Sequence, residues 1–465
     1  MINPGGYNRH LESLSRGDFD ISRLYCLTPI NINTGTSESL TSYISRLAEA
    51  HCVSVGTLIG KEMAPVLGKE YIIKSSKNGG NTFYKSGNEL NGIGKLADDF
   101  AQCLSEFTGL NSVKSLTLVA LHDVLPIRDM FRQNKAWCPL CLESWHKKSN
   151  PIYEPLIWCI KAVKLCEIHG TMLSSICSNC RMEIPVISRR ARNGFCSFCG
   201  CWLGLNTINK DEKMSFEQLV WEQYITANIG HLISQKSELK SASRSDIYNF
   251  IKLVAEKLGG LCAFSRYFDI PKSSASQWLE GVHRPTLQTL LKICYRLKVS
   301  IIEAFSPEQI CFSISPGNSG YSDTMVDIKT KNKAKVKRIN WNVVENKLND
   351  IISNRTSPPP SVNEAAKGLE CTKRSLYCHF SALCKKISAN HTQYLKLVKE
   401  ERINEAALNI AEAVNTIKNS GLYPSRRRIE SLLSPNIVLR ESAYQIAWKK
   451  AMLDINVPDR IIVKA

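Results

Sequence analysis

The sequence predicts a mainly α-helical, multidomain protein whose N-terminal domain carries two zinc-binding sites and is followed by helix-turn-helix domains. Three observations lead to this prediction. The chain of 465 residues has room for roughly two to four domains. Apolar residues recur at helical spacing through most of the chain. Four closely spaced Cys/Cys or Cys/His pairs follow one another in the stretch from Trp137 to Leu203.

These four pairs have the spacing of zinc ligands: Cys138 with Cys141, Cys166 with His169, Cys177 with Cys180, and Cys196 with Cys199. Two residues between partners let both side chains bind one ion from a tight turn, and two such knuckles complete a tetrahedral site. A cross-brace would join the first knuckle to the third. Sequential pairing is favoured because the spacer at residues 181–194 is short, basic and glycine-containing, as in a zinc ribbon. We expect two structural zinc ions per chain, with no coordination position open to substrate.

Other Cys and His residues in this stretch are weaker candidates. Cys159 lies in an apolar run and is expected in the core, whereas Cys201 and His146 are spare ligand candidates.

The formal net charge of +18 is unevenly distributed. Residues 1–205 carry 22 basic and 17 acidic side chains, and residues 206–465 carry 38 and 25, so the net charges are +5 and +13. This asymmetry favours double-stranded DNA as a partner of the second half, although a solvated basic surface would have the same composition. The 18 cysteines follow no signal peptide, and no apolar run approaches the length of a membrane span. We expect a protein of the reducing cytoplasm that is not associated with membranes.

The first domain is expected over residues 1–205. After a loop that contains Pro29, Ser37 can cap a helix beginning at Glu38. Arg46 lies beside the apolar stripe of that helix; it either reaches across the stripe to an acidic group or is an ordinary solvated arginine. Residues 75–95 read as a loop, and helical patterns resume at Leu96–Phe107 and Val113–Leu121. The stripe itself consists of Leu40, Tyr43, Ile44, Leu47 and Ala48.

Several of these segments together resemble the TniQ domain: ESLTSYISRLA, the CPLCL knuckle, the tryptophan-containing segment before CEIHG, the second CxxC, and FCSFCG. The resemblance covers about residues 20–205. The chain departs from the usual pattern at Glu167, where proline commonly precedes the knuckle histidine. TniQ and TnsD are target-selection proteins of bacterial transposons, so the resemblance implies an AAA+ regulator (TnsC-like) as partner and, through it, the transposase.

The second domain is expected over residues 214–312 and resembles a helix-turn-helix of the phage-repressor type. Its first motif helix is expected at Leu261–Phe268, a turn at Asp269–Pro271, and the recognition helix at about Ser273–Glu280. Trp278 and Leu279 are expected to face the core; the alternative is a small bundle that packs only against protein. The candidate DNA contacts on the recognition helix are Lys272, Ser273, Ser274, Ser276 and Gln277.

The remaining chain is expected to form a basic linker over residues 313–340 and a helical domain over residues 341–465. In the latter, Lys373–Phe380 reads as a second recognition helix, with candidate DNA contacts at Lys373, Arg374, Ser375 and Tyr377. Cys378 and Cys384 are expected to be core thiols. A long connecting helix is expected from about Gln393 to Lys418. A weaker third motif follows, with Arg426, Arg427 and Arg428 in the first turn of a helix; these arginines also suit an ordinary basic surface.

No catalytic constellation stands out, because the chain has no GxxxxGK[ST] loop and no clear two-metal carboxylate set. We expect no enzymatic activity. Three functions remain open at this point. The first is a TnsD-like selector that recognises a chromosomal attachment site and recruits the AAA+ regulator. The second is a TniQ-type adaptor between a CRISPR effector complex and that regulator, as in CRISPR-associated transposons. The third is a zinc-containing transcription regulator.

Overall fold

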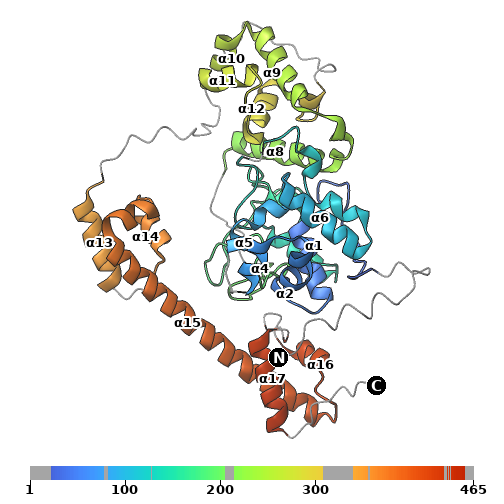
Figure 1. Cartoon of the computed structure of the whole chain (residues 1–465), viewed down its shortest axis with the longest axis vertical. Helices are drawn as coiled ribbons and strands as arrows, with labels where there is room; N and C mark the ends of the chain where they lie inside the picture. Colours follow the sequence, from blue (N-terminus) through green and yellow to red (C-terminus); the bar gives the residue numbers. More distant parts are fainter. Residues whose placement is uncertain are drawn as a thin grey trace. The chain divides into compact units, whose positions relative to one another are not determined.

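A computed structural model describes residues 22–77, 82–126, 128–204, 214–306, 339–353, 357–433, 437, 439 and 441–455. The fold is mainly helical, as predicted. Within these ranges no strand forms, and β pairing is limited to isolated bridges such as that between Trp137 and Ser174. No helix in the described part of the chain has the length and apolar character needed to cross a membrane. The chain divides into two compact units, Met1–Tyr321 and Ser322–Ala465 (Figure 1).

The first part of unit 1 is built around α1 (Leu40–Ala50), whose apolar stripe is completely buried as predicted. Its core also includes Phe100 and Leu104 of α6 and Ile187 from the cysteine-rich segment. The other elements of this part are α2 (Val55–Thr57), the π-helix η1 (Leu58–Met63), α3 (Ala64–Val66), α4 (Glu70–Lys77), α5 (Thr82–Lys85), α6 (Lys95–Thr108), α7 (Pro139–Lys147), and the 3₁₀ segments η2 (Gly87–Asn91), η3 (Asn111–Leu116), η4 (Val119–Leu121) and η5 (Leu156–Cys159).

Two predictions about this part are wrong in detail. The cap of α1 is Ser39, which accepts a hydrogen bond from the Ser42 amide, whereas Ser37 stabilises the preceding loop by donating to the Asn31 and Thr34 carbonyls. The expected loop at residues 75–95 contains the end of α4, α5 and η2. These helical parts form because Phe83 and Leu90 pack into the core, which compensates for the poor helix propensity of Gly, Asn and Ser residues.

The second part of unit 1 is a helical bundle with the expected helix-turn-helix. Phe264 and Ala275 are fully buried between α10 and α11, and Asp269 adopts a left-handed conformation (φ 53°) that ends α10. Trp278 and Leu279 are only half-buried, although both lie on the same face of α11 as the fully buried Ala275. The elements are α8 (Phe216–Gln235), η6 (Glu238–Ser241), α9 (Arg244–Leu258), α10 (Leu261–Phe268), α11 (Lys272–Leu279), α12 (Leu287–Leu297) and η7 (Glu303–Phe305).

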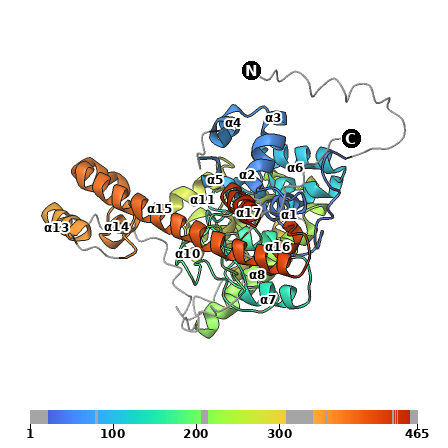
Figure 2. The same ribbon diagram turned by 90° about the horizontal axis from the view of Figure 1, so that it is seen from below.

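Unit 2 contains two separate cores at the two ends of one long helix, α15 (Lys373–Asn419) (Figures 1 and 2). Two shorter helices, α13 (Trp341–Ser353) and α14 (Val362–Gly368), form the first core with the start of α15. At the other end, α16 (Arg426–Leu432) and α17 (Ser442–Asp454) form the second core.

The long helix also corrects two predictions. Helices were expected at Lys373–Phe380 and from about Gln393, but the chain is helical throughout α15 except at Phe380, where the backbone is kinked (φ −133°, ψ 49°). The kink lets Leu376 and Ile387 enter the same core on either side of it. Cys384 is buried as expected, whereas Cys378 is exposed, because it lies on the opposite side of the helix from Leu376.

Candidate functional site

The first metal-ligand cluster lies where α7 begins. Cys138 is the N-cap of α7, Pro139 occupies its first turn, and Cys141 follows one turn later. Two backbone hydrogen bonds, Cys166 N–H to Thr171 O and Gly170 N–H to Cys166 O (both 2.8 Å), form the turn that presents Cys166 and His169. The Cys141 sulfur lies 3.5 Å from that of Cys166 and 3.2 Å from His169 Nδ1. All four ligand atoms lie within 4.8 Å of one another.

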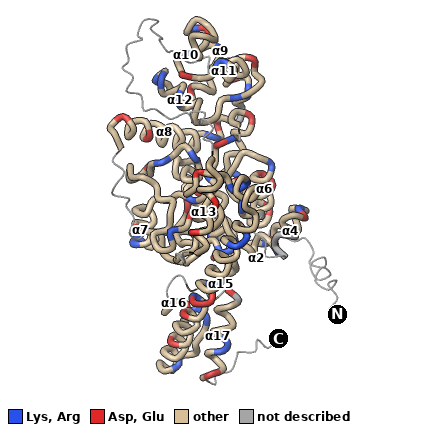
Figure 3. Tube along the Cα trace, turned by 90° about the vertical axis from the view of Figure 1, so that its left-hand side faces the viewer, with Lys and Arg blue, Asp and Glu red and all other residues tan. Residues whose placement is uncertain are grey.

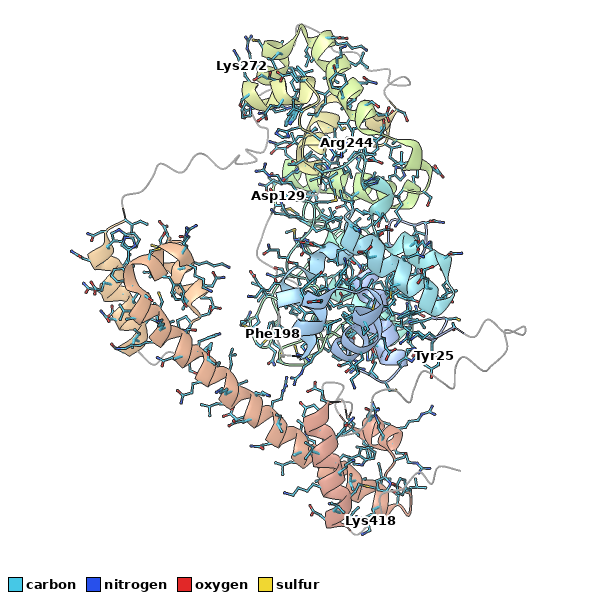
Figure 4. The ribbon with its side chains drawn as sticks, viewed as in Figure 1. Tyr25, Asp129, Phe198, Arg244, Lys272 and Lys418 are labelled. Carbon is cyan, nitrogen blue, oxygen red and sulfur yellow. The ribbon has the colours of Figure 1, made fainter. Side chains whose placement is uncertain are left out.

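The second cluster is formed by two turns of the same kind. The Cys177 carbonyl accepts from the Arg181 N–H (3.0 Å), and the Cys196 carbonyl accepts from the Gly200 N–H (2.9 Å). Both donor residues have left-handed backbone conformations. The Cys177 and Cys199 sulfurs are 3.7 Å apart, as are those of Cys180 and Cys196. These four sulfurs also lie within 4.8 Å of one another, so the structure groups the ligands sequentially. The second of these turns carries Phe198, which is exposed at its tip (Figure 4).

Both clusters fit a tetrahedral zinc ion. Zinc–sulfur bonds of about 2.3 Å place neighbouring ligand atoms about 3.8 Å apart, close to the sulfur–sulfur distances of 3.5 and 3.7 Å. Hydrogen bonds from neighbouring thiols lower the pKa of Cys138 and of Cys199, whereas those from Cys138 and Cys196 raise the pKa of Cys141 and of Cys180, so one thiol in each cluster is favoured as the thiolate that binds metal. Zinc would hold each pair of turns together, and four protein ligands leave no position for a substrate.

The weaker ligand candidates lie outside both sets. Cys159 accepts a hydrogen bond from Asn91 (3.2 Å), and burial raises the pKa of its thiol to about 12. The His146 ring lies against Trp202, with ring centroids 5.1 Å apart. Cys201 lies outside the second set but close to it, with its sulfur 3.2 Å from that of Cys177.

A buried polar network joins α1 to the metal-binding segments. Arg46 donates to Glu38 at 2.6 Å, which confirms that it reaches an acidic group, and Glu38 is completely buried. Glu38 also accepts from Ser42 (2.8 Å), and Ser42 Oγ accepts from the Glu154 amide (2.9 Å) and from Asn193 (2.8 Å). Asn193 belongs to the segment between the two halves of the second cluster. The network therefore connects both cysteine-rich segments to one helix.

Residues 29–173 match the TniQ family model. No curated protein matches the chain. The match includes the whole first cluster, α1 and all of its polar network except Asn193. The second cluster begins just after the match, yet Ile187 and Asn193 from that segment pack against α1. The TniQ domain and the second cluster are thus continuous in the structure.

The bundle that follows is attached to the TniQ domain at several places. Lys164 pairs with the buried Glu222 of α8, and the Glu167 carboxylate lies against Gly35 and Gly230, which leaves no space for a side chain at either glycine. Arg284, five residues after α11, donates to the Asp123 carbonyl at 2.7 Å. Lys236, 2 % exposed, donates to the Ser115 carbonyl. Sequence analysis missed these contacts because each partner is far away in the chain.

Only some of the candidate DNA contacts on the first motif are exposed to solvent. Lys272, Ser273 and Gln277 are exposed on α11, whereas Ser274 and Ser276 are half-buried and Ser276 donates to Glu280 (Figure 4 labels Lys272). The motif and the turn after it, residues 261–283, carry two basic and two acidic side chains. Its charge alone therefore supplies little attraction for phosphates.

The second motif is more basic. Residues 362–386 carry five Lys or Arg and two Glu, and both Lys373 and Arg374 are exposed at the start of α15. Ser375 and Tyr377 are half-buried, and the Lys373 ammonium lies 5.9 Å from the centre of the Tyr377 ring. A helix start with exposed Lys and Arg suits phosphate and base-edge contacts.

The three arginines of the third motif differ in their exposure and in the contacts that their guanidinium groups already make. Arg426 is half-buried and pairs with Glu430 at 3.1 Å, and Arg428 donates to the Tyr423 carbonyl at 3.0 Å. Arg427 is exposed on α16, and Figure 3 marks the Lys and Arg positions along the trace. The linker lysines Lys329, Lys331, Lys333, Lys335 and Lys337 lie outside the described residues.

Proposed function

We propose that this protein selects target sites for transposition by binding a chromosomal attachment site directly and recruiting the AAA+ regulator of a transposon. The observation that carries the proposal is the combination, in one chain, of a TniQ domain with three candidate DNA-binding motifs. Target selection requires one surface that recognises DNA and another that recognises the transposition machinery, and this chain has separate elements available for each.

The distribution of charge supports direct binding of DNA. The second half of the sequence carries a net charge of +13, and the second motif carries five Lys or Arg against two Glu, with Lys373 and Arg374 exposed at a helix start. Lys and Arg contacts to phosphates supply most of the sequence-independent affinity for DNA. Contacts from α11, α15 and α16 to base edges would then supply specificity.

The zinc ions would have a structural role in this function. Both ligand sets are complete, so we expect no metal-assisted catalysis at either cluster. Their effect would be to hold the TniQ domain in the conformation that the AAA+ regulator recognises. The TnsD-like assignment follows from the length of chain that remains for DNA recognition after the TniQ domain.

The proposal is tested by selecting bound sequences from random double-stranded DNA with the full-length, zinc-loaded protein. Because the motifs expose different side chains, we expect one long, asymmetric site that is protected in one orientation. Binding without sequence preference, or a short palindrome bound by a dimer, would contradict direct site selection. The preformed DNA complex should then capture the purified AAA+ regulator encoded beside the gene, and Arg374→Ala should weaken DNA binding without weakening binding of the regulator in the absence of DNA.

A further inference from the structure

The second metal-ligand cluster contains a fifth thiol that zinc binding does not require. Cys201 lies outside the set of four sulfurs that are mutually within 4.8 Å, yet its own sulfur is 3.2 Å from that of Cys177. A disulfide bond needs about 2.0 Å between the sulfurs, so a movement of little more than 1 Å would bond them. For comparison, the Cys177–Cys199 and Cys180–Cys196 sulfur–sulfur distances within the ligand set are both 3.7 Å.

The backbone on both sides of Cys201 keeps the thiol at this position. Its carbonyl accepts from the Cys196 amide at 2.9 Å, and the Leu203 amide donates to the Gly194 carbonyl at 2.9 Å. The Trp202 indole donates to Glu143 of α7 at 3.1 Å. Because these contacts use the Cys196 backbone amide, other backbone atoms and the Trp202 indole, and no ligand sulfur, we expect Cys201 to stay beside Cys177 when zinc is bound.

The two thiols differ in their access to solvent. Cys177 is buried, whereas Cys201 is half-buried. A small oxidant can therefore reach the Cys201 sulfur while the Cys177 sulfur is held against it from the inside.

We propose that Cys201 and Cys177 form a peroxide-sensitive pair that releases the zinc ion of the second cluster. The Cys201 sulfur gives up its proton and attacks one oxygen of hydrogen peroxide; it becomes a sulfenic acid, and the other oxygen leaves as hydroxide and takes up that proton to give water. The Cys177 sulfur then attacks the sulfenic sulfur, the disulfide forms, and the hydroxyl group leaves with a proton as a second water. In total, two thiols and one peroxide give one disulfide and two waters, and zinc loses Cys177 as a ligand.

Zinc release would affect the TniQ domain through the segment between the two halves of the cluster. That segment supplies Asn193, which donates to both the carbonyl and the hydroxyl of Ser42 on α1, and Ile187, which packs in the same core. Three ligands hold zinc less tightly than four, so oxidation is expected to loosen these contacts while the first cluster keeps its ion.

The test uses the full-length protein loaded with two zinc ions. After addition of hydrogen peroxide, zinc release is followed with a colorimetric chelator, and disulfides are mapped by mass spectrometry without reduction. We expect release of one of the two ions together with a Cys177–Cys201 disulfide. Reductant and added zinc should restore the starting state. A disulfide that joins other cysteines, or release of both ions at one rate, would overturn the proposal.

Variants separate this role from a structural one. Cys201→Ser and Cys201→Ala should each bind two zinc ions and lose the second ion several-fold more slowly than the unmodified protein. The control Cys262→Ser removes an exposed thiol of α10 and should behave like the unmodified protein. If either Cys201 variant bound only one zinc ion before oxidation, Cys201 would be a ligand and the proposal would be wrong. Unchanged release rates in these variants would also exclude it.

Discussion

Replacing Arg46 by methionine should strongly destabilise the TniQ domain. The substitution keeps most of the side-chain volume but removes the guanidinium that contacts Glu38 at 2.6 Å. Glu38 would retain hydrogen bonds from Ser42 (2.8 Å) and the Ile30 amide (3.1 Å), but its completely buried carboxylate would have lost its counter-charge. Removing one partner of a buried ion pair costs about 3–5 kcal/mol, mostly because the remaining charge stays buried.

Hydrogen exchange of the α1 amides, measured by mass spectrometry on the full-length protein, gives the free energy of opening in this domain. A loss of about 3–5 kcal/mol corresponds to roughly a hundredfold to a few thousandfold faster exchange. The matched control is Lys161→Met, which removes the exposed pair with Asp129 (2.8 Å, side chains 56 % and 61 % exposed) and should change exchange little. The double variant Glu38→Gln/Arg46→Met should be more stable than Arg46→Met, because it leaves no buried charge.

The same variant should depend on pH in a defined direction. Burial raises the pKa of Glu38, and Arg46 is the largest influence that opposes this increase. Without Arg46 the folded domain binds a proton at Glu38 more tightly than the unfolded chain does, so its stability falls as pH rises through the folded-state pKa. The loss of folding stability caused by Arg46→Met should therefore be smaller at about pH 5 than at about pH 8. An equal deficit at both pH values, or no greater effect than Lys161→Met, would refute this reasoning.

Three further outcomes are expected. Metal analysis should find two zinc ions per chain, because four ligands complete each site. Cys138→Ser and Cys177→Ser should each lose one ion, together with part of the helical circular dichroism signal. Full metal content in either variant would contradict the ligand sets. In titrations of the selected DNA site, Arg374→Ala should cost roughly 1–3 kcal/mol of binding free energy and relax specificity at one end only. Arg427→Ala should cost more binding free energy than Arg426→Ala, because the Arg426 guanidinium already pairs with Glu430. Burial lowers the pKa of Lys236 from 10.5 to about 8, so the unfolded chain binds this proton more tightly than the folded chain does. The free energy of unfolding should therefore rise by about 3 kcal/mol as the pH increases between these two values. In a series of unfolding measurements at different pH values, Lys236→Met should abolish that rise.

The metal-ligand sets could be predicted from the sequence because both partners of each pair lie in one turn. Spacing alone then determines that the two side chains of a pair converge, as with Cys196 and Cys199. The apolar stripe of α1 was predictable for a similar reason, since helical periodicity places Leu40, Tyr43 and Ile44 on one face. Local rules were sufficient where the structure depends on near neighbours.

Contacts between distant segments could not be predicted in this way. An acidic partner was one of two interpretations of Arg46, and nothing in the sequence showed that Ser42 would also join Glu154 and Asn193. Cys378 was expected in the core because cysteine is usually buried, and it is exposed because its helix turns a different face to α13 and α14. The helix at residues 82–85 depends on a core contact of Phe83 that overrides the local preference for a loop.

The attachment of the first helix-turn-helix to the TniQ domain has a consequence for target selection. Arg284 lies close to the recognition helix in sequence, where an arginine would ordinarily be available to phosphates, but its guanidinium donates to the Asp123 carbonyl instead. Lys236 and Lys164 make further contacts between the same two parts. If α11 binds DNA, the orientation of the TniQ domain relative to that part of the site is fixed by these contacts and not by a flexible linker. A selector needs this property, because insertion on one side of a site requires the machinery to be presented in one direction.

Replacing Arg284 by methionine should therefore disturb the orientation of insertion more than it lowers the affinity for DNA, and sequencing of insertion junctions would show this as an increase in reversed or misplaced products.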